Sequence, residues 1–191
     1  VMELALMLGW RQKFLAEGLL MSDNIKDPQK LISWAKEQHE FYKKPWLALV
    51  VKVLPVITIL SLILAIKKII VPFYIPVLLV LIQYFMLKYK KFERYEIFKI
   101  ADRFGKDIAA YNKMIKLFEK MDFQADRLKE IKRKMAGETG KPAYDQINSL
   151  AKIVESISNR NVPLYFIFNL LTLSDYRKMI VLEKWKVTSG R

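Results

Sequence analysis

The sequence contains no cysteine and only one histidine among its 191 residues. Without cysteine, neither a disulfide framework nor a thiolate metal site can form. The single histidine, His39, cannot build a zinc site alone, and no nucleophile turn accompanies it. A phosphate-binding G-x-x-x-x-G-K-[ST] loop is also missing, because Gly140-Lys141 is followed by Pro142. We therefore expect no catalytic residue, metal ligand or cofactor site, and no enzymatic activity, in this chain.

Acidic residues are absent from residues 46–87, a stretch whose only charges are Lys52, Lys67 and Lys68. The two adjacent lysines separate two apolar runs, Trp46 to Ile66 and Ile69 to Leu87. A membrane-spanning helix needs about 20 mostly apolar residues, and neither run has the polar face of a soluble core helix. The sequence therefore predicts a transmembrane helical hairpin. Its second span has an open boundary, because Pro72 to Pro76 fits either the turn or the helix.

Basic residues are in excess, and they gather after the hairpin. The net charge is +14, with 7 basic and 6 acidic residues in 1–47 (net +1) but 15 basic and 8 acidic residues in 88–135 (net +7). Basic residues that flank the two spans are Lys43, Lys44, Lys88, Lys90, Lys91 and Arg94. Because such residues stay cytoplasmic, we expect both termini on the cytoplasmic side of the inner membrane, with the lipid bilayer as a partner.

The fold class predicted is all-α, with a transmembrane hairpin inserted in an elongated helical bundle, because no strand-like alternation bounded by turns occurs. Four segments are expected: an N-terminal helical segment of the core (1–45), the hairpin (46–87), a long basic lever-like arm (88–135) and C-terminal core helices (136–191). The arm carries a coiled-coil-like seam of apolar residues with steps of three and four. The seam comprises Ile97, Ile100, Phe104, Ile108, Tyr111, Ile115, Phe118 and Met121.

Helix boundaries follow from glycine, proline and polar residues. Gly9 and Gly18 are expected breaks, and Asp27-Pro28 is an expected helix start. The arm should break near 122–124, where the seam loses its period. Residues 143–158 form an amphipathic pattern, and one last helix is expected from Pro163 to about Lys186.

A compact basic cluster ends the arm: Lys129, Lys132, Arg133 and Lys134. Three interpretations of the basic arm stay open. It is a solvated helix face that also sets membrane topology, or its juxtamembrane lysines bind anionic headgroups, or the cluster is a phosphate-contact patch for DNA or another nucleic acid.

Short motifs on both sides of the hairpin resemble those of membrane-anchored relatives of the DNA mismatch-repair protein MutS. Before the hairpin, Trp10-Arg11-Gln12 and Glu17-Gly18-Leu19 resemble an R-x-x-L-x-x-x-G helix. After it, the chain resembles the family's R-N-x-x, L-N-x-L, W-D and L-E-x-W elements, with Ser174 where the family has Trp. These elements are Arg160-Asn161, Phe168-Asn169-Leu170-Leu171, Ser174-Asp175 and Leu182-Glu183-Lys184-Trp185.

The resemblance implies the core and lever region of a P-loop ATPase that dimerises and uses ATP and Mg²⁺. The ATPase domain would follow Arg191, so we expect the chain to be an excerpt of a longer protein. Packing and domain-junction roles are implied for Arg160, Asn161, Asn169, Asp175, Glu183 and Trp185. Two alternatives remain: a stand-alone membrane scaffold that binds a helical protein partner through the 97–121 seam, and a soluble basic bundle that binds nucleic acid with 46–87 as its core.

Overall fold

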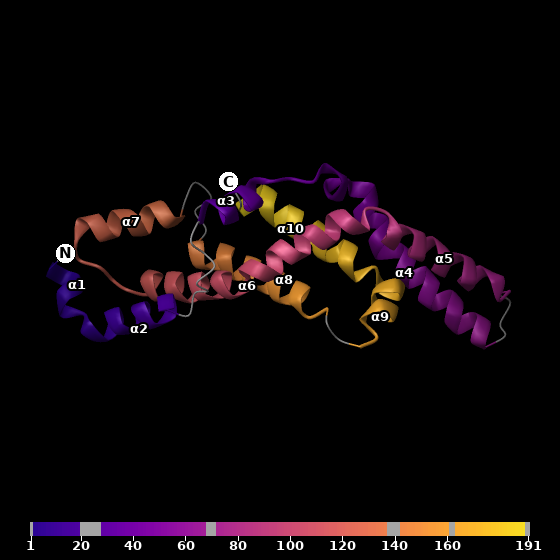
Figure 1. The fold of residues 1–191 in the computed structure, drawn as a ribbon, viewed down its shortest axis with the longest axis horizontal. Helices are drawn as coiled ribbons and strands as arrows, with labels where there is room; N and C mark the ends of the chain where they lie inside the picture. The colour runs from indigo at the N-terminus through magenta and orange to yellow at the C-terminus, as the bar shows by residue number, and fades with distance from the viewer. Residues whose placement is uncertain (1, 20–27, 68–71, 137–141, 161–162, 190–191) are drawn as a thin grey trace. The chain divides into compact units, whose positions relative to one another are not determined.

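The computed structural model describes residues 2–19, 28–67, 72–136, 142–160 and 163–189, and every regular element in these ranges is a helix (Figure 1). The all-α prediction is thus confirmed. The helices form two compact units, Val1–Trp34 with Asp102–Glu155 (unit 1) and Ala35–Ala101 with Ser156–Arg191 (unit 2). Each unit combines residues that precede the hairpin with residues that follow it. The four-segment division follows the order of the chain instead and stays a prediction.

Unit 1 is centred on the C-terminal part of α6 (Lys91–Glu119), beside which α2 (Leu8–Leu19) packs. The Trp10 indole stacks on Phe14, meets the Phe123 ring edge-on and lies near Phe118. Its Nε1 donates to the Leu117 carbonyl at 3.1 Å. These rings bury a large apolar area, so they are the main contact that holds α2 on α6.

The helix α8 (Ala143–Ser158) pairs with α6 in the antiparallel sense within unit 1. Asn112 Nδ2 donates to Asn148 Oδ1 at 3.2 Å. One turn away on α8, the Tyr144 N–H donates to the Glu119 carboxylate. At Gly105, a Cβ would lie only 3.2 Å from Val154 Cγ1. The missing side chain therefore permits the close approach of the two helices.

The predicted seam faces the interior of the chain. Ile97, Phe104 and Ile108 are buried, and the later seam residues are half-buried. The expected break near 122–124 lies within the irregular segment between the end of α6 at Glu119 and the start of α7 (Asp126–Ala136). Glu3, on α1 (Met2–Leu6), caps that segment by accepting from the backbone N–H groups of Gln124 and Ala125 at 2.7 and 2.8 Å. These two hydrogen bonds hold the pKa of Glu3 below its usual value.

Unit 2 contains the hairpin of α4 (Pro45–Ile66) and α5 (Tyr74–Lys88), which run side by side in Figure 1. The short helix α9 (Tyr165–Thr172) packs on both of them. The helix α10 (Ser174–Ser189) packs on α4, on α9 and on the 3₁₀ turn η1 (Glu40–Lys43) that leads into α4. Three elements, η1, α9 and α10, thus pack on the hairpin.

Several helix boundaries differ from the sequence-based expectation. Gly9 and Gly18 lie inside α2, and the break comes earlier, at Met7. The helix α3 (Pro28–Lys36) starts at Pro28 as predicted; Asp27 lies outside the described residues. The helix α5 starts only at Tyr74, so Pro72 belongs to the turn and the second span is the shorter one.

The single C-terminal helix predicted from Pro163 is wrong. The chain breaks between α9 and α10 at Leu173, which has the left-handed φ of 51° and is fully buried. Asn169 and Asp175 stabilise this break, because the Asp175 N–H donates to Asn169 Oδ1 at 2.9 Å. The spacing of apolar residues is the same on both sides of this break, so the sequence pattern does not reveal it.

Truncation of Trp10 tests the packing of unit 1. We expect Trp10→Ala to lower the free energy of unfolding of this unit by about 3 kcal/mol, the lower end for a buried Trp, because the indole is half-buried. Trp10→Phe should cost about 1 kcal/mol, since it keeps ring packing and loses the bond to Leu117. Chemical denaturation followed by circular dichroism measures both; equal losses would contradict the role of ring packing, and an unchanged free energy of unfolding in Trp10→Phe would contradict the hydrogen bond.

Candidate membrane-anchoring site

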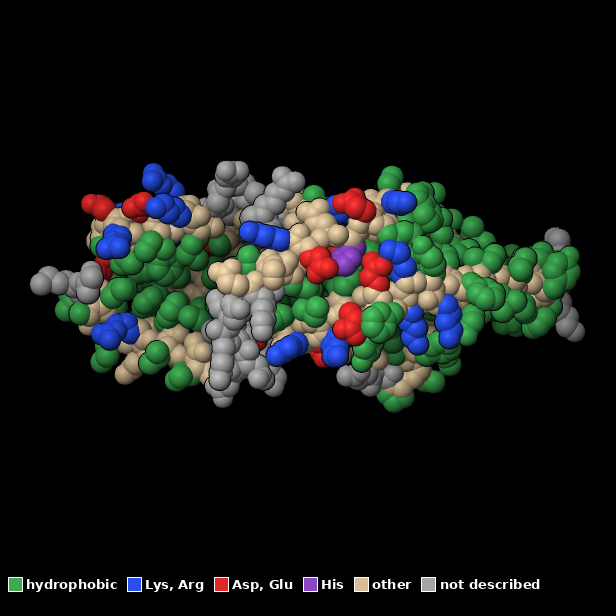
Figure 2. All heavy atoms as spheres, turned by 45° about the horizontal axis from the view of Figure 1, so that its top comes forward, with side chains coloured by type: hydrophobic (Ala, Val, Ile, Leu, Met, Phe, Trp, Pro, Cys, Tyr) green, Lys and Arg blue, Asp and Glu red, His purple; other side chains and the backbone are tan. Residues whose placement is uncertain are grey.

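The hairpin exposes an apolar surface that its own chain does not cover. The helix α4 is the one described helix that is long and apolar enough to cross a membrane, and only 22% of its most apolar window is buried. At about 1.5 Å per residue its 22 residues reach about 33 Å, the thickness of a hydrocarbon core. Figure 2 shows hydrophobic side chains over most of the visible hairpin and Lys and Arg side chains near its base.

Exposed aromatic side chains gather at both ends of the hairpin. At the base they are Trp46, Phe85, Tyr89, Phe92 and Tyr95, and beside the turn they are Phe73 and Tyr74. Aromatic rings concentrate where a membrane protein meets the two headgroup regions. The spacing of these two groups along α4 and α5 therefore fits the two faces of a bilayer.

The helix α9 adds a third apolar element to this surface. It contacts both hairpin helices, yet it leaves Phe166, Ile167 and Phe168 more than half exposed. Its position is fixed by polar contacts with α10. Tyr165 donates its hydroxyl proton to Asp175 at 2.7 Å, and Lys178 Nζ donates to the same hydroxyl oxygen at 3.0 Å.

Inside α4, Pro55 has no N–H for the Val51 carbonyl, which would otherwise be its helical partner. Arg177 of α10 lies 3.4 Å from that carbonyl and points a guanidinium N–H toward it. The hydroxyls of Thr58 and Ser61 donate to carbonyls of the preceding turn of α4. Polar groups in this span are thus largely satisfied within unit 2, as an apolar environment requires.

The end of α5 is capped by Arg94, which is 3% exposed. Its Nη1 donates to the Tyr89 carbonyl at 2.6 Å, and its Nη2 donates to the Leu87 carbonyl. The guanidinium lies 4.3 Å from the centre of the Tyr176 ring, and the Tyr176 hydroxyl donates to the Met86 carbonyl at 2.7 Å. A cation and a hydroxyl therefore satisfy the carbonyls that a helix leaves unpaired at its C-terminus.

The other predicted juxtamembrane residues lie at the same base. Lys44 is the exposed residue before α4, and Lys43 pairs with Glu40. Lys90 has a left-handed φ of 51°, pairs with Glu93 at 2.8 Å and lies over the Phe41 ring. Lys88 and Lys91 are exposed, Lys88 near the face of Tyr84. Lys88 and Lys91 are thus the most accessible cations at the end of α5.

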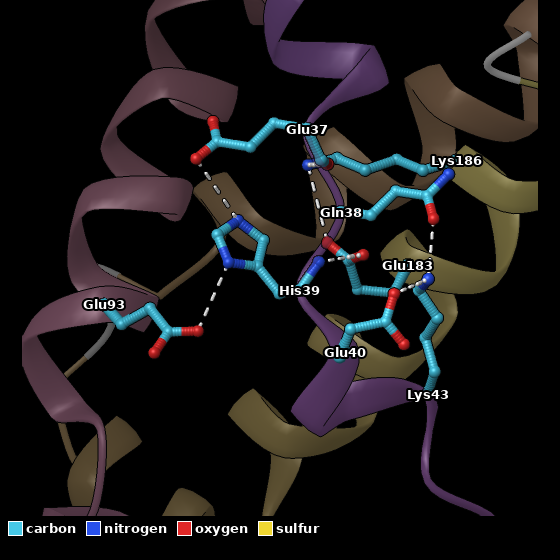
Figure 3. A network of polar contacts seen from close by, with 8 residues as sticks. All are labelled: Glu37, Gln38, His39, Glu40, Lys43, Glu93, Glu183 and Lys186. Atoms are coloured by element: carbon cyan, nitrogen blue, oxygen red, sulfur yellow. Dashed lines mark hydrogen bonds and ion pairs between the residues drawn. The ribbon is translucent and has the colours of Figure 1, made fainter.

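A polar network fixes the segment that enters α4 (Figure 3). Glu183 is fully buried on α10; it accepts from the His39 N–H at 2.9 Å and pairs with Lys186 at 3.4 Å. Lys186 Nζ donates to the Glu37 carbonyl at 3.0 Å, and His39 Nδ1 lies 3.3 Å from Glu93 of α6. Burial lowers the pKa of Lys186, and the nearby Glu183 carboxylate opposes that effect.

The residues that the MutS resemblance singled out lie mostly in these contacts. Arg160 donates from Nε to the Ile157 carbonyl at 2.8 Å and covers the Phe98 ring. Asn169 and Asp175 join α9 to α10, Glu183 holds the entry segment, and Trp185 is half-buried. Asn161 lies outside the described residues. The structure thus gives most of this set a packing role in unit 2, and a domain-junction role stays a prediction.

The basic cluster at the end of the arm lies on α7, in unit 1. Lys132 Nζ donates to the Met121 carbonyl at 2.8 Å, and Lys134 pairs with Glu130 at 2.7 Å. Asp126 and Glu130 lie beside Lys129 and Arg133 on the same helix surface. Acidic neighbours and internal bonds therefore reduce the positive potential of the cluster, while contact with nucleic acid stays a prediction.

Sequence reasoning did not identify three residues that carry much of this site. Tyr42 and Tyr176 are buried side by side next to Arg94, and Tyr165 anchors α9. A tyrosine within a helical pattern does not reveal which group its hydroxyl will bond. The apolar character of 164–168 was visible, and its exposure on the hairpin was not.

Replacement of Arg94 tests the capping of α5. We expect Arg94→Met to lower the free energy of unfolding in detergent micelles by about 3 kcal/mol, because the Leu87 carbonyl loses its donor and the Tyr89 carbonyl keeps only the longer contact with the Tyr176 hydroxyl. The exposed Arg103 provides the matched control, and Arg103→Met should change stability by less than about 0.5 kcal/mol. Thermal unfolding followed by circular dichroism distinguishes them, and equal behaviour of the two variants would remove the capping role.

Alkaline pH should weaken unit 2. Burial raises the pKa of Tyr42 to about 12 and raises the pKa values of Tyr165 and Tyr176, for Tyr165 together with its hydrogen bond to Asp175. Because the folded-state values lie above the unfolded value of about 10, the stabilisation is complete below that pH and is lost as pH rises through the raised values. Tyr42→Phe should make this loss smaller, because one of the three groups with a raised pKa is removed. Denaturation curves between about pH 9 and 12 measure it, and a constant free energy of unfolding would contradict it.

Comparison of the chain with protein-family models, curated proteins and solved structures gives no match. The likeness to membrane-anchored MutS relatives therefore stays a prediction from short motifs. In unit 2, an uncovered apolar hairpin, two groups of exposed aromatic rings and a set of basic residues at the hairpin base occur together.

Proposed function

We propose that this chain is a non-catalytic membrane anchor that carries a helical module. The hairpin of α4 and α5 is inserted in the bilayer, and α9 lies in the headgroup region beside it. The basic residues at the hairpin base face the cytoplasm, so that both ends of the hairpin return to the same side. The helices of unit 1 are then held near the membrane surface as a scaffold.

The exposed surface of α4 is the observation that carries this proposal. A core helix of a soluble bundle is covered by its neighbours, whereas α4 leaves most of its large apolar side chains uncovered. These exposed residues are Leu49, Val53, Val56, Ile57, Ile59, Leu60, Ile63 and Ile66. The alternative of a soluble bundle with 46–87 as its core does not fit this arrangement.

The resemblance to MutS relatives supports a more specific form of the proposal. In this form of the proposal, the chain is the anchor and lever region of a dimeric ATPase, with ATP and Mg²⁺ bound by parts of the parent protein outside the described helices. The DNA contact predicted for the basic cluster of α7 belongs to this form as well. A scaffold that captures a partner helix through the 97–121 seam is less favoured, because the seam is buried or half-buried in the chain itself. A P-loop motif encoded shortly after Arg191 in the parent gene would support the ATPase form, and a stop codon there would exclude it.

Cysteine labelling tests the anchor directly, because the chain has no cysteine of its own. We expect Lys44→Cys and Lys88→Cys to react with a membrane-impermeant maleimide from one side of a vesicle, and Lys67→Cys from the other. The reason is that α4 is long enough to span the core, with Lys44 and Lys67 at its two ends.

Two results, one from salt extraction and one from the labelling, would contradict the proposal. Release of the protein from membranes by high salt alone would contradict insertion. Labelling of all three positions from the same side would contradict a spanning α4 and leave only surface binding. A matched position in unit 1, Lys152→Cys, is exposed and should label on the same side as Lys44→Cys.

A further inference from the structure

A cavity of about 330 Å³ opens at the base of the hairpin, entirely within unit 2. It lies where α5 ends and α6 begins, and α9 and α10 close its other side. Its lining combines basic, aromatic and a few polar side chains. Among the lining residues are Tyr84, Lys88, Lys91, Arg94, Arg160 and Phe166.

The charges around the cavity are unequal. Four cations line it, Lys88, Lys91, Arg94 and Arg160, against one carboxylate, Asp175. That carboxylate already accepts from the Tyr165 hydroxyl and the Asn169 amide at 2.7 and 2.8 Å. The cavity therefore has a surplus of three positive charges, and it favours an anionic occupant.

The two arginines are held in place by the protein. Arg94 is tied to the carbonyls at the end of α5, and Arg160 is tied to the Ile157 carbonyl and stacks on Phe98. Fixed guanidinium groups recognise phosphate with little loss of side-chain freedom. Lys88 and Lys91 lie at the mouth and are exposed, so they supply charge that an entering anion meets first.

The position of the cavity selects among anions. Its wall includes Tyr84 of the hairpin and Phe166 of α9, and Phe166 is 61% exposed. A ligand with a phosphate and an apolar chain would place the phosphate among the cations and the chain along these rings. Basic pockets beside membrane helices on the cytoplasmic side are known to take such headgroups.

We propose that this cavity binds the phosphate headgroup of an anionic phospholipid from the cytoplasmic leaflet. The inference rests on the proposed membrane anchor and adds a specific lipid contact to it. Bound lipid would cover the cavity-lining aromatic rings of α5, α6 and α9 together, and would neutralise cations that the protein itself leaves in excess.

The test measures lipid bound to the full chain in neutral detergent micelles by native mass spectrometry, with phosphatidylglycerol and phosphatidylcholine as probes. The wild type should retain phosphatidylglycerol at least tenfold better than phosphatidylcholine. Lys88→Gln with Lys91→Gln should reduce phosphatidylglycerol retention at least fivefold. The control pair, Lys44→Gln with Lys184→Gln, removes the same charge from exposed positions that do not line the cavity, and it should retain the lipid.

A second variant tests the geometry rather than the charge. Arg160→Lys keeps the positive charge and loses the planar fork, so phosphatidylglycerol retention should fall although net charge is unchanged. Equal loss in the cavity pair and the control pair would show a diffuse charge effect and overturn the proposal. Displacement of the lipid by millimolar inorganic phosphate would assign the site to free anions instead.

Failure of this proposal is separable from failure of the anchor. The maleimide labelling pattern of Lys67→Cys reports insertion, and it should be the same with or without the cavity substitutions. A protein that inserts normally but shows no preference for phosphatidylglycerol would overturn the lipid site alone. A protein that does not insert would overturn both.

Discussion

The last carbonyls of α5 are the constraint on which unit 2 depends. A helix leaves its final carbonyls unpaired, and a buried carbonyl without a donor is costly. Arg94 from α6 and Tyr176 from α10 supply the donors. Since those donors come from two later helices, the end of the span determines where both must pack. The buried Tyr42 beside them links the segment before α4 to the same point.

The same principle extends along the hairpin. Pro55 removes a donor inside α4, and Arg177 of α10 is directed to the carbonyl that lost its partner. Glu183 and Lys186, also on α10, hold the segment that leads into α4. One C-terminal helix therefore contacts the segment before α4, the first part of α4 and the end of α5. Tyr176, Arg177 and Lys186 of this helix each donate to a backbone carbonyl of another segment, and Glu183 accepts from a backbone N–H.

The sequence predicted those features that depend on composition and period. The apolar runs, the basic flanks, the break after Glu119 and the helix 143–158 needed only local patterns. The break at Leu173 could not be predicted, because it arises from contacts between Asn169 and Asp175 that do not alter the apolar period. The cavity was likewise invisible, since Lys91 and Arg160 are far apart in sequence and meet only through the fold. The 97–121 seam was visible in the sequence, but its period does not say whether it packs on helices of the same chain or on another protein. The structure shows that it packs within the chain.

The unequal arms of the hairpin have a consequence for the surrounding lipid. The helix α4 has 22 residues and α5 has 15, so the two differ by 7 residues or about 10 Å. A bilayer matched to α4 is too thick for α5, and this hydrophobic mismatch is relieved by tilt of the hairpin or by thinning of the lipid near α5. Tilt and thinning each cost about a fraction of a kcal/mol per Å of mismatch, which is enough to distribute proteins between membranes of different thickness. The hairpin would then reside preferentially in thin or readily deformed regions of the membrane.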